Sequence, residues 1–92
     1  MARHIEEQLY SSLIDAKFRF MARGEHHIDD IYARVKTEFP LLCDDQYFCS
    51  ENCNAGNNQS EWKHTVRNAL QRLKKLDQNI AFTGKRGYWS FG

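Results

Sequence analysis

The stretch from residue 60 to residue 76 combines a strict apolar periodicity with a high density of cations. Ser60 suits the N-cap because its hydroxyl can accept a hydrogen bond from an unpaired backbone N–H of the first turn. Lys74 and Lys75 fall where the negative end of the helix dipole favours cations. The pattern predicts an amphipathic helix over 60–76, with a basic outer face and one apolar face. That apolar face carries Trp62, Val66, Ala69, Leu70, Leu73 and Leu76 at spacings of three and four residues.

Two short apolar runs follow this helix, separated by the sequence Thr-Gly-Lys-Arg-Gly. They predict a β-hairpin over 79–91. Glycine adopts the backbone conformations of tight turns without steric cost, so Gly84 and Gly87 can bend the chain while Lys85 and Arg86 occupy the tip. A basic helix followed by a basic hairpin constrains the fold more than any other part of the chain.

The N-terminal segment has a second helical pattern. Its apolar side chains recur close to every four residues, at Ile5, Leu9, Leu13, Ala16 and Phe20. This spacing predicts a helix over 5–23, which Gly24 should end because glycine readily adopts the left-handed conformation that closes a helix. Residues 25–28 are expected to form a short extended link.

A shorter helix is predicted over 29–39, with Asp29 or Asp30 as its cap. The helix should end before Pro40, because a residue that precedes proline is displaced from helical geometry. The periodicity then disappears, and 41–59 is predicted to be one long loop rich in Asn and Cys.

Length and composition limit the chain to one domain. A chain of 92 residues can bury a modest core, so residues 1–92 are predicted to form a single α+β domain with three helices and a small antiparallel sheet that includes the C-terminal hairpin. No run approaches the ~20 apolar residues of a membrane span. The first residues lack the apolar stretch of a secretory signal. We therefore expect a cytosolic protein whose cysteines are thiols.

The net charge of +1 is the average of two segments of opposite sign. Residues 1–59 carry six Lys or Arg against ten Asp or Glu, which gives −4, and residues 60–92 carry seven against two, which gives +5. Cations gathered on one helix and one turn favour a polyanion as ligand. A solvated basic surface without a ligand is the alternative that charge alone leaves open.

Three cysteines and a histidine raise the question of zinc. Cys43, Cys49, Cys53 and His64 have the spacing C-x5-C-x3-C-x10-H, whereas structural zinc sites usually present a tight C-x2-C or C-x4-C pair. We expect neither zinc nor another cofactor. Cys43 then serves as a small buried apolar residue, and the other two are loop thiols.

Residues with a catalytic pattern are scarce. The sequence has no Gly-rich phosphate loop, no nucleophile at a recognisable distance from a base, and no nuclease-type carboxylate pair followed by a lysine. His26 and His27 beside Asp29 and Asp30 come nearest to a site, with a metal or acid-base role as one reading and a turn with a helix cap as the other. We expect a binding domain and not an enzyme.

The residues from Trp62 to Leu70 and from Gly84 to Phe91 resemble the recognition helix and wing of winged-helix DNA-binding domains. They are similar in particular to the winged helices attached to restriction endonucleases, modification-dependent ones among them, and more faintly to forkhead domains, from which the Cys- and Asn-rich loop departs. The resemblance covers the last third of the chain. It implies a winged helix-turn-helix fold, a double-stranded DNA target, a nuclease domain in a parent protein of a prokaryotic cytosol and, in some relatives, recognition of N6-methyladenine.

A helix in the major groove would turn the polar side chains of its first half toward base edges: Lys63, His64, Arg67, Asn68 and Gln71. Arg67 suits guanine, and Asn68 or Gln71 suits adenine. Trp62 either fills the core or packs against a base methyl group. Phosphate contacts are expected from Ser60, Arg72, Lys74, Lys75, Lys85 and Arg86, and loop contacts from Asn57, Asn58 and Gln59. The alternative is a winged helix that docks on an acidic protein partner.

Overall fold

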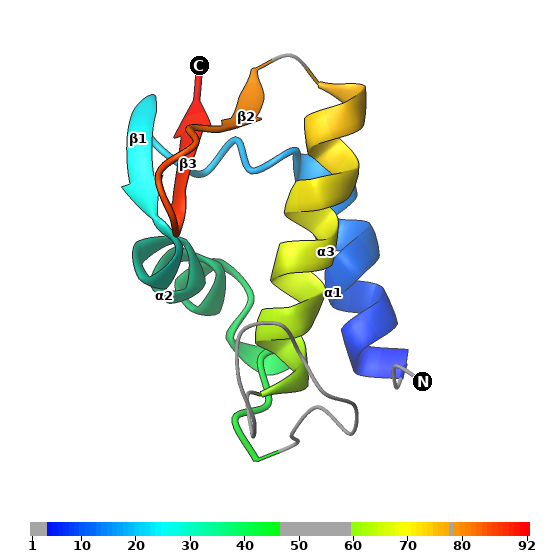
Figure 1. Ribbon diagram of the computed structural model, residues 1–92. Helices are drawn as coiled ribbons and strands as arrows, with labels where there is room; N and C mark the ends of the chain where they lie inside the picture. The colour runs from blue at the N-terminus through cyan, green and yellow to red at the C-terminus, as the bar shows by residue number, and fades with distance from the viewer. Residues whose placement is uncertain (1–3, 47–59, 78) are drawn as a thin grey trace.

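The computed structural model describes residues 4–46, 60–77 and 79–92, and over these residues the chain is an α+β domain with three α-helices and a small antiparallel sheet. Figure 1 shows the elements in chain order. They are α1 (His4–Ala16), β1 (Gly24–His27), α2 (Ile28–Glu38), the 3-10 turn η1 (Pro40–Leu42), α3 (Glu61–Leu76), β2 (Ile80–Phe82) and β3 (Tyr88–Phe91). Among the described helices, none is long and apolar enough to cross a bilayer.

The sheet has three strands in the order β1-β3-β2, all antiparallel. In the C-terminal hairpin, Ile80 lies opposite Phe91 and Phe82 lies opposite Trp89. The segment predicted as an extended link is β1, and it pairs with the other edge of β3, where His26 lies opposite Trp89. The sequence prediction therefore had the extended conformation right and missed the pairing.

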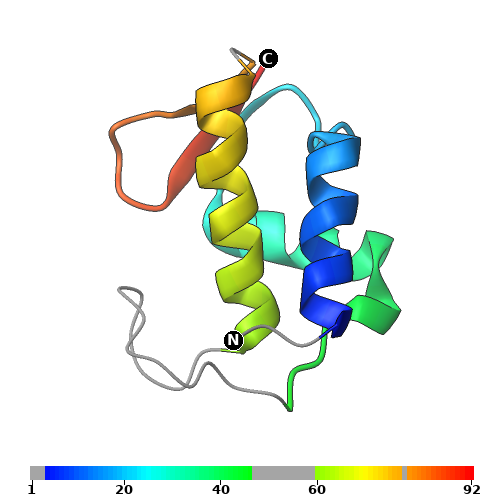
Figure 2. The ribbon, with the colours of Figure 1, turned by 90° about the vertical axis from the view of Figure 1, so that its right-hand side faces the viewer.

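The core lies between the helices and the sheet. Helices α1 and α3 run side by side in both views (Figures 1 and 2), and α2 crosses near them below the sheet. Buried side chains from every layer meet there: Leu9, Leu13, Phe18, Ile31, Tyr32, Val35, Cys43, Trp62, Val66, Ala69, Leu70, Leu73, Ile80, Trp89 and Phe91. The apolar stripe predicted on α3 accounts for much of this core, except that Leu76 at its C-terminal end is exposed.

Helix α1 is shorter than predicted, because it ends at Ala16 and not at residue 23. Lys17 and Phe18 both take the left-handed backbone conformation with φ of 54°. A continued helix would have carried Phe18 off the stripe that holds Leu13, whereas the turn buries its ring against Phe91, with ring centroids 5.9 Å apart. Burial of this aromatic ring offsets the strain of the two left-handed residues.

Helix α2 begins and ends close to the predicted bounds, but its cap is different. His27 is the N-cap, and its Nδ1 accepts a hydrogen bond from the backbone N–H of Asp29 at 3.1 Å. Asp29 and Asp30 lie in the first turn, where the helix dipole favours acidic side chains. The helix ends before Pro40, and the residues that follow form η1.

Candidate nucleic-acid interface

Helix α3 exposes a polar face that faces away from the core. Thr65 is buried together with the apolar stripe of α3. The rest of the helix surface carries the side chains predicted to contact a ligand. Lys63, His64 and Arg67 are half-buried, and Asn68 and Gln71 are exposed. All five therefore lie on the accessible side of the helix, at the positions that its amphipathic pattern predicts.

Arg67 is held by contacts from two helices. Its Nη1 donates a hydrogen bond to the hydroxyl of Tyr32 on α2 at 3.2 Å, and its Nη2 lies 3.4 Å from Nδ1 of His64, one turn earlier on α3. The ammonium of Lys63 lies over the Tyr32 ring, 5.4 Å from its centroid. The two cations of the N-terminal half of α3 thus share one aromatic neighbour that the sequence analysis did not single out.

Trp62 is a core residue. Only 2% of its surface is exposed, its ring packs edge-on against Tyr32 with centroids 5.7 Å apart, and its indole N–H donates to Oδ1 of Asp45 at 2.8 Å. Of the two roles predicted for Trp62, the structure supports the core role, and the predicted contact with a base is wrong for this conformation. The indole fills space under the helix and satisfies its polar atom internally.

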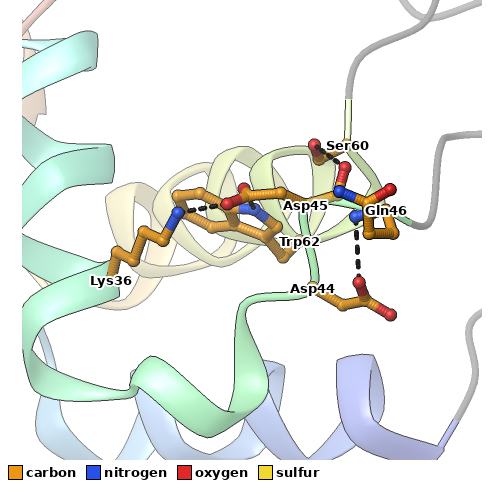
Figure 3. A network of polar contacts seen from close by, with 6 residues as sticks. All are labelled: Lys36, Asp44, Asp45, Gln46, Ser60 and Trp62. Atoms are coloured by element: carbon orange, nitrogen blue, oxygen red, sulfur yellow. Dashed lines mark hydrogen bonds and ion pairs between the residues drawn. The ribbon is translucent and has the colours of Figure 1, made fainter.

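Asp45 links α2 to the N-terminal end of α3 (Figure 3). Its carboxylate accepts hydrogen bonds from the Lys36 ammonium and from the Trp62 indole, and both donors hold the pKa of Asp45 below its usual value, Lys36 more than Trp62. The Asp45 carbonyl accepts a hydrogen bond from the Ser60 hydroxyl at 3.4 Å. Ser60 is the N-cap residue but makes no side-chain cap bond and is buried, so both roles predicted for its hydroxyl need correction.

Arg67 is held by side chains of Tyr32 and His64, whereas the cations in the C-terminal half of α3 have no comparable contacts among the described residues. Arg72, Lys74 and Lys75 are exposed, and within the described residues none of them makes a side-chain hydrogen bond or an ion pair. Long flexible cations of this kind suit contacts with phosphates, which need charge more than fixed geometry.

The hairpin tip is a defined turn. Gly84 and Gly87 have φ of 90° and 82°, conformations that L-residues rarely adopt, so the glycines bracketing Lys85 and Arg86 are required by the backbone. The ammonium of Lys85 lies 4.4 Å from the centroid of the Tyr88 ring. Figure 2 shows the loop between β2 and β3 projecting past α3 on the side away from α1. Lys85 and Arg86 at the tip are exposed, as are Asn68 and Gln71 on the outer face of α3.

The residues considered for metal binding show structural roles where they are described. His27 caps α2, and His26 Nε2 lies 2.8 Å from the carbonyl oxygen of Ala22. Cys43 is buried, and desolvation, with a smaller effect from Asp45, raises the pKa of its thiol to about 12. No group of three metal-ligating side chains occurs among the described residues. The remaining predicted ligands and loop contacts lie outside the described residues: Cys49, Cys53, Asn57, Asn58 and Gln59.

A further basic group lies in the turn after α1. Lys17, Arg19 and Arg23 line an open cleft of about 670 Å³ together with Leu76 and Asp77 at the end of α3. In the sequence, these three cations belong to residues 1–59, the segment with a net negative charge. Folding brings them to the C-terminal end of α3, after a bend at Lys17 and Phe18 that the sequence pattern did not predict.

Comparisons with protein families, with curated proteins and with solved structures give no match to this chain.

Proposed function

We propose that this chain is a winged-helix module that binds double-stranded DNA, with α3 in the major groove and the β2–β3 hairpin on the backbone. The observation that carries the proposal is that the polar face of α3 and the basic hairpin tip are both exposed, with the hairpin loop projecting past α3 (Figure 2). An α-helix fits the width of the major groove, and a glycine-bounded turn with two cations fits beside a phosphate chain.

The order of the elements supports the same proposal. A helix, a strand, two further helices and a hairpin follow one another, and the first strand adds to the hairpin at β3. This arrangement is compatible with a winged helix. It puts the hairpin next to the start of α2, where the backbone N–H of Ile28 donates to the carbonyl of Gly87 at 2.6 Å.

The proposed contacts fall into two groups. Base edges are assigned to Lys63, His64, Arg67, Asn68 and Gln71, and phosphates to Arg72, Lys74, Lys75, Lys85 and Arg86. Trp62 and Ser60 are omitted because both are buried. Contacts from Asn57, Asn58 and Gln59 stay a prediction from the sequence.

The helix and hairpin residues resemble the winged helices attached to restriction endonucleases, and this resemblance extends the proposal to a parent protein. We propose that the module directs a restriction-type endonuclease of a prokaryotic cytosol to its target, with N6-methyladenine among the bases it reads. Recognition of the methyl group requires an apolar contact, which the buried Trp62 does not offer in this conformation. Methylated and unmethylated duplexes therefore have to be compared directly.

The test is a mobility-shift panel of duplexes, with and without N6-methyladenine, repeated over a range of salt concentrations. If the five assigned cations each neutralise one phosphate, log K should fall with log salt with a slope of roughly −4 to −5. Lys85→Ala should weaken all duplexes about equally and reduce the magnitude of the slope by about 1. Arg67→Glu should lower affinity and sequence preference together.

Arg34→Ala is the matched control for charge. Arg34 is a half-exposed cation on α2, paired with Glu38 at 3.5 Å, and it lies two residues from Tyr32 and thus on the other side of the helix. Its removal should leave the slope unchanged. Absence of duplex binding at low salt would refute the proposal and favour the alternative, a module that docks on an acidic protein.

A further inference from the structure

Tyr32 lies at the centre of the cations on the N-terminal half of α3. Its side chain belongs to α2 and is only 5% exposed, and its ring packs edge-on against Trp62 at 5.7 Å between centroids. The hydroxyl accepts the hydrogen bond from Nη1 of Arg67, and the ring lies under the ammonium of Lys63. This buried ring therefore presents one polar atom and one face to two cations of α3.

The contacts of Arg67 define the plane of its guanidinium group. Nη1 is fixed from α2 by Tyr32, at 3.2 Å, and Nη2 from α3 by His64, at 3.4 Å. Arginine has five N–H donors in one plane, so contacts at two different nitrogens restrict rotation of the whole group. Bidentate recognition of guanine needs the guanidinium plane aligned with the base edge.

We infer that Tyr32 is a positioning residue that orients Arg67 for bidentate recognition of guanine in the major groove. The inference rests on the proposed function and adds to it a base and a residue outside α3 that determines specificity. An arginine held in its binding orientation loses less side-chain entropy when it meets the base, so the tyrosine hydroxyl contributes to discrimination without touching DNA.

Tyr32→Phe is the decisive variant, because it keeps the ring, its packing on Trp62 and the surface under Lys63, and it removes only the hydroxyl. A preferred duplex is first selected from a randomised pool with the unchanged protein. Binding is then measured for that duplex and for versions in which each guanine is replaced by adenine. The preference for one guanine should fall by about 2- to 10-fold, as expected for loss of one hydrogen bond. The salt slope should not change.

Two further variants separate positioning from a general effect on folding. Tyr10→Phe removes a hydroxyl from a half-buried tyrosine on α1 and should leave the guanine preference unchanged. Arg67→Ala should abolish the preference, and in that background Tyr32→Phe should have no additional effect. Nitrogen-15 relaxation of the Arg67 Nε–H in free protein should show greater side-chain motion in Tyr32→Phe than in the unchanged chain.

Absence of binding to any duplex would refute the proposed function, and the relaxation measurement would still test whether Tyr32 orders Arg67. Binding with a guanine preference that Tyr32→Phe leaves intact would overturn the inference alone. An equal loss of affinity for all duplexes would also overturn it, because the hydroxyl would then support phosphate contacts and not base recognition.

Discussion

The two glycines of the hairpin tip allow a direct measurement of how firmly the hairpin is joined to α2. Gly84 and Gly87 have nearly the same φ, 90° and 82°, and both lie in the turn that carries Lys85 and Arg86. A Cβ atom at Gly84 would meet no heavy atom within 4 Å, whereas a Cβ atom at Gly87 would lie 3.0 Å from Nε2 of His27. Alanine at the two positions therefore imposes similar backbone strain and different steric strain.

The expected costs follow from these contacts. Positive φ costs an L-residue about 1–2 kcal/mol, and the smaller unfolded-state entropy of alanine returns about 0.4–1 kcal/mol, so Gly84→Ala should destabilise by about 1 kcal/mol. Gly87→Ala should cost about 1–2 kcal/mol more, because the His27 ring must move. That ring is held by the N–H of Asp29 at 3.1 Å and packs edge-on against Tyr88. Its movement also weakens the cap of α2.

Urea unfolding followed by far-UV circular dichroism measures both variants against the unchanged protein. In a His27→Ala background the overlap is absent, so the cost of Gly87→Ala should fall to that of Gly84→Ala. The reasoning is refuted if the two glycine variants differ by less than about 0.5 kcal/mol in the presence of His27, which is the limit of ordinary additivity.

Two other predictions concern stability. Asp45→Asn should destabilise by about 1–2 kcal/mol at pH 7 through loss of the charge-assisted contacts with Lys36 and Trp62. The pKa of Asp45 is lower in the folded state, so its contribution is present above about pH 4 and is lost as pH falls through the folded pKa; a difference from the unchanged protein that does not shrink as the pH is lowered below about 4 would contradict this origin. Lys17→Gly should stabilise by about 0.5–1 kcal/mol, because glycine removes left-handed strain at an exposed position and keeps the backbone bond from Lys17 N to the Leu13 carbonyl. Ala16→Gly, one residue earlier in regular helix, should instead destabilise by about 0.5–1 kcal/mol, and melting curves compare the two.

Much of the fold could be predicted because local patterns determine it. The period of α3 identifies its buried face, Pro40 limits α2, and the glycines of the hairpin fix its turn within a few residues. The end of α1 could not be read in this way. Apolar periodicity continues to Phe20, and it is the tertiary burial of Phe18 that breaks the helix at Ala16.

The candidate interface could be predicted only in its parts. Helical spacing and charge identify the outer face of α3, but they say nothing of which side chains are held and which are free to move. Tyr32 and Asp45 reach α3 from other segments, so no spacing in the sequence relates them to Arg67 or Trp62. The pairing of β1 with β3 is similarly non-local, since a four-residue strand has no pattern of its own.

The cations of the candidate interface divide into those held by an aromatic residue and those free to move, and the two groups should contribute differently to binding. Lys63 and Arg67 lie against the ring or hydroxyl of Tyr32, and Lys85 lies against Tyr88, whereas Arg72 and Lys74 are exposed without a partner among the described residues. A charge in a loose side chain attracts a phosphate from many directions and therefore contributes affinity without sequence information. A cationic side chain held in one orientation loses less conformational entropy on binding and discriminates against an acceptor that is not aligned with it. For the base-contacting residues of α3, sequence preference should therefore depend on Tyr32 as much as on Lys63 and Arg67 themselves.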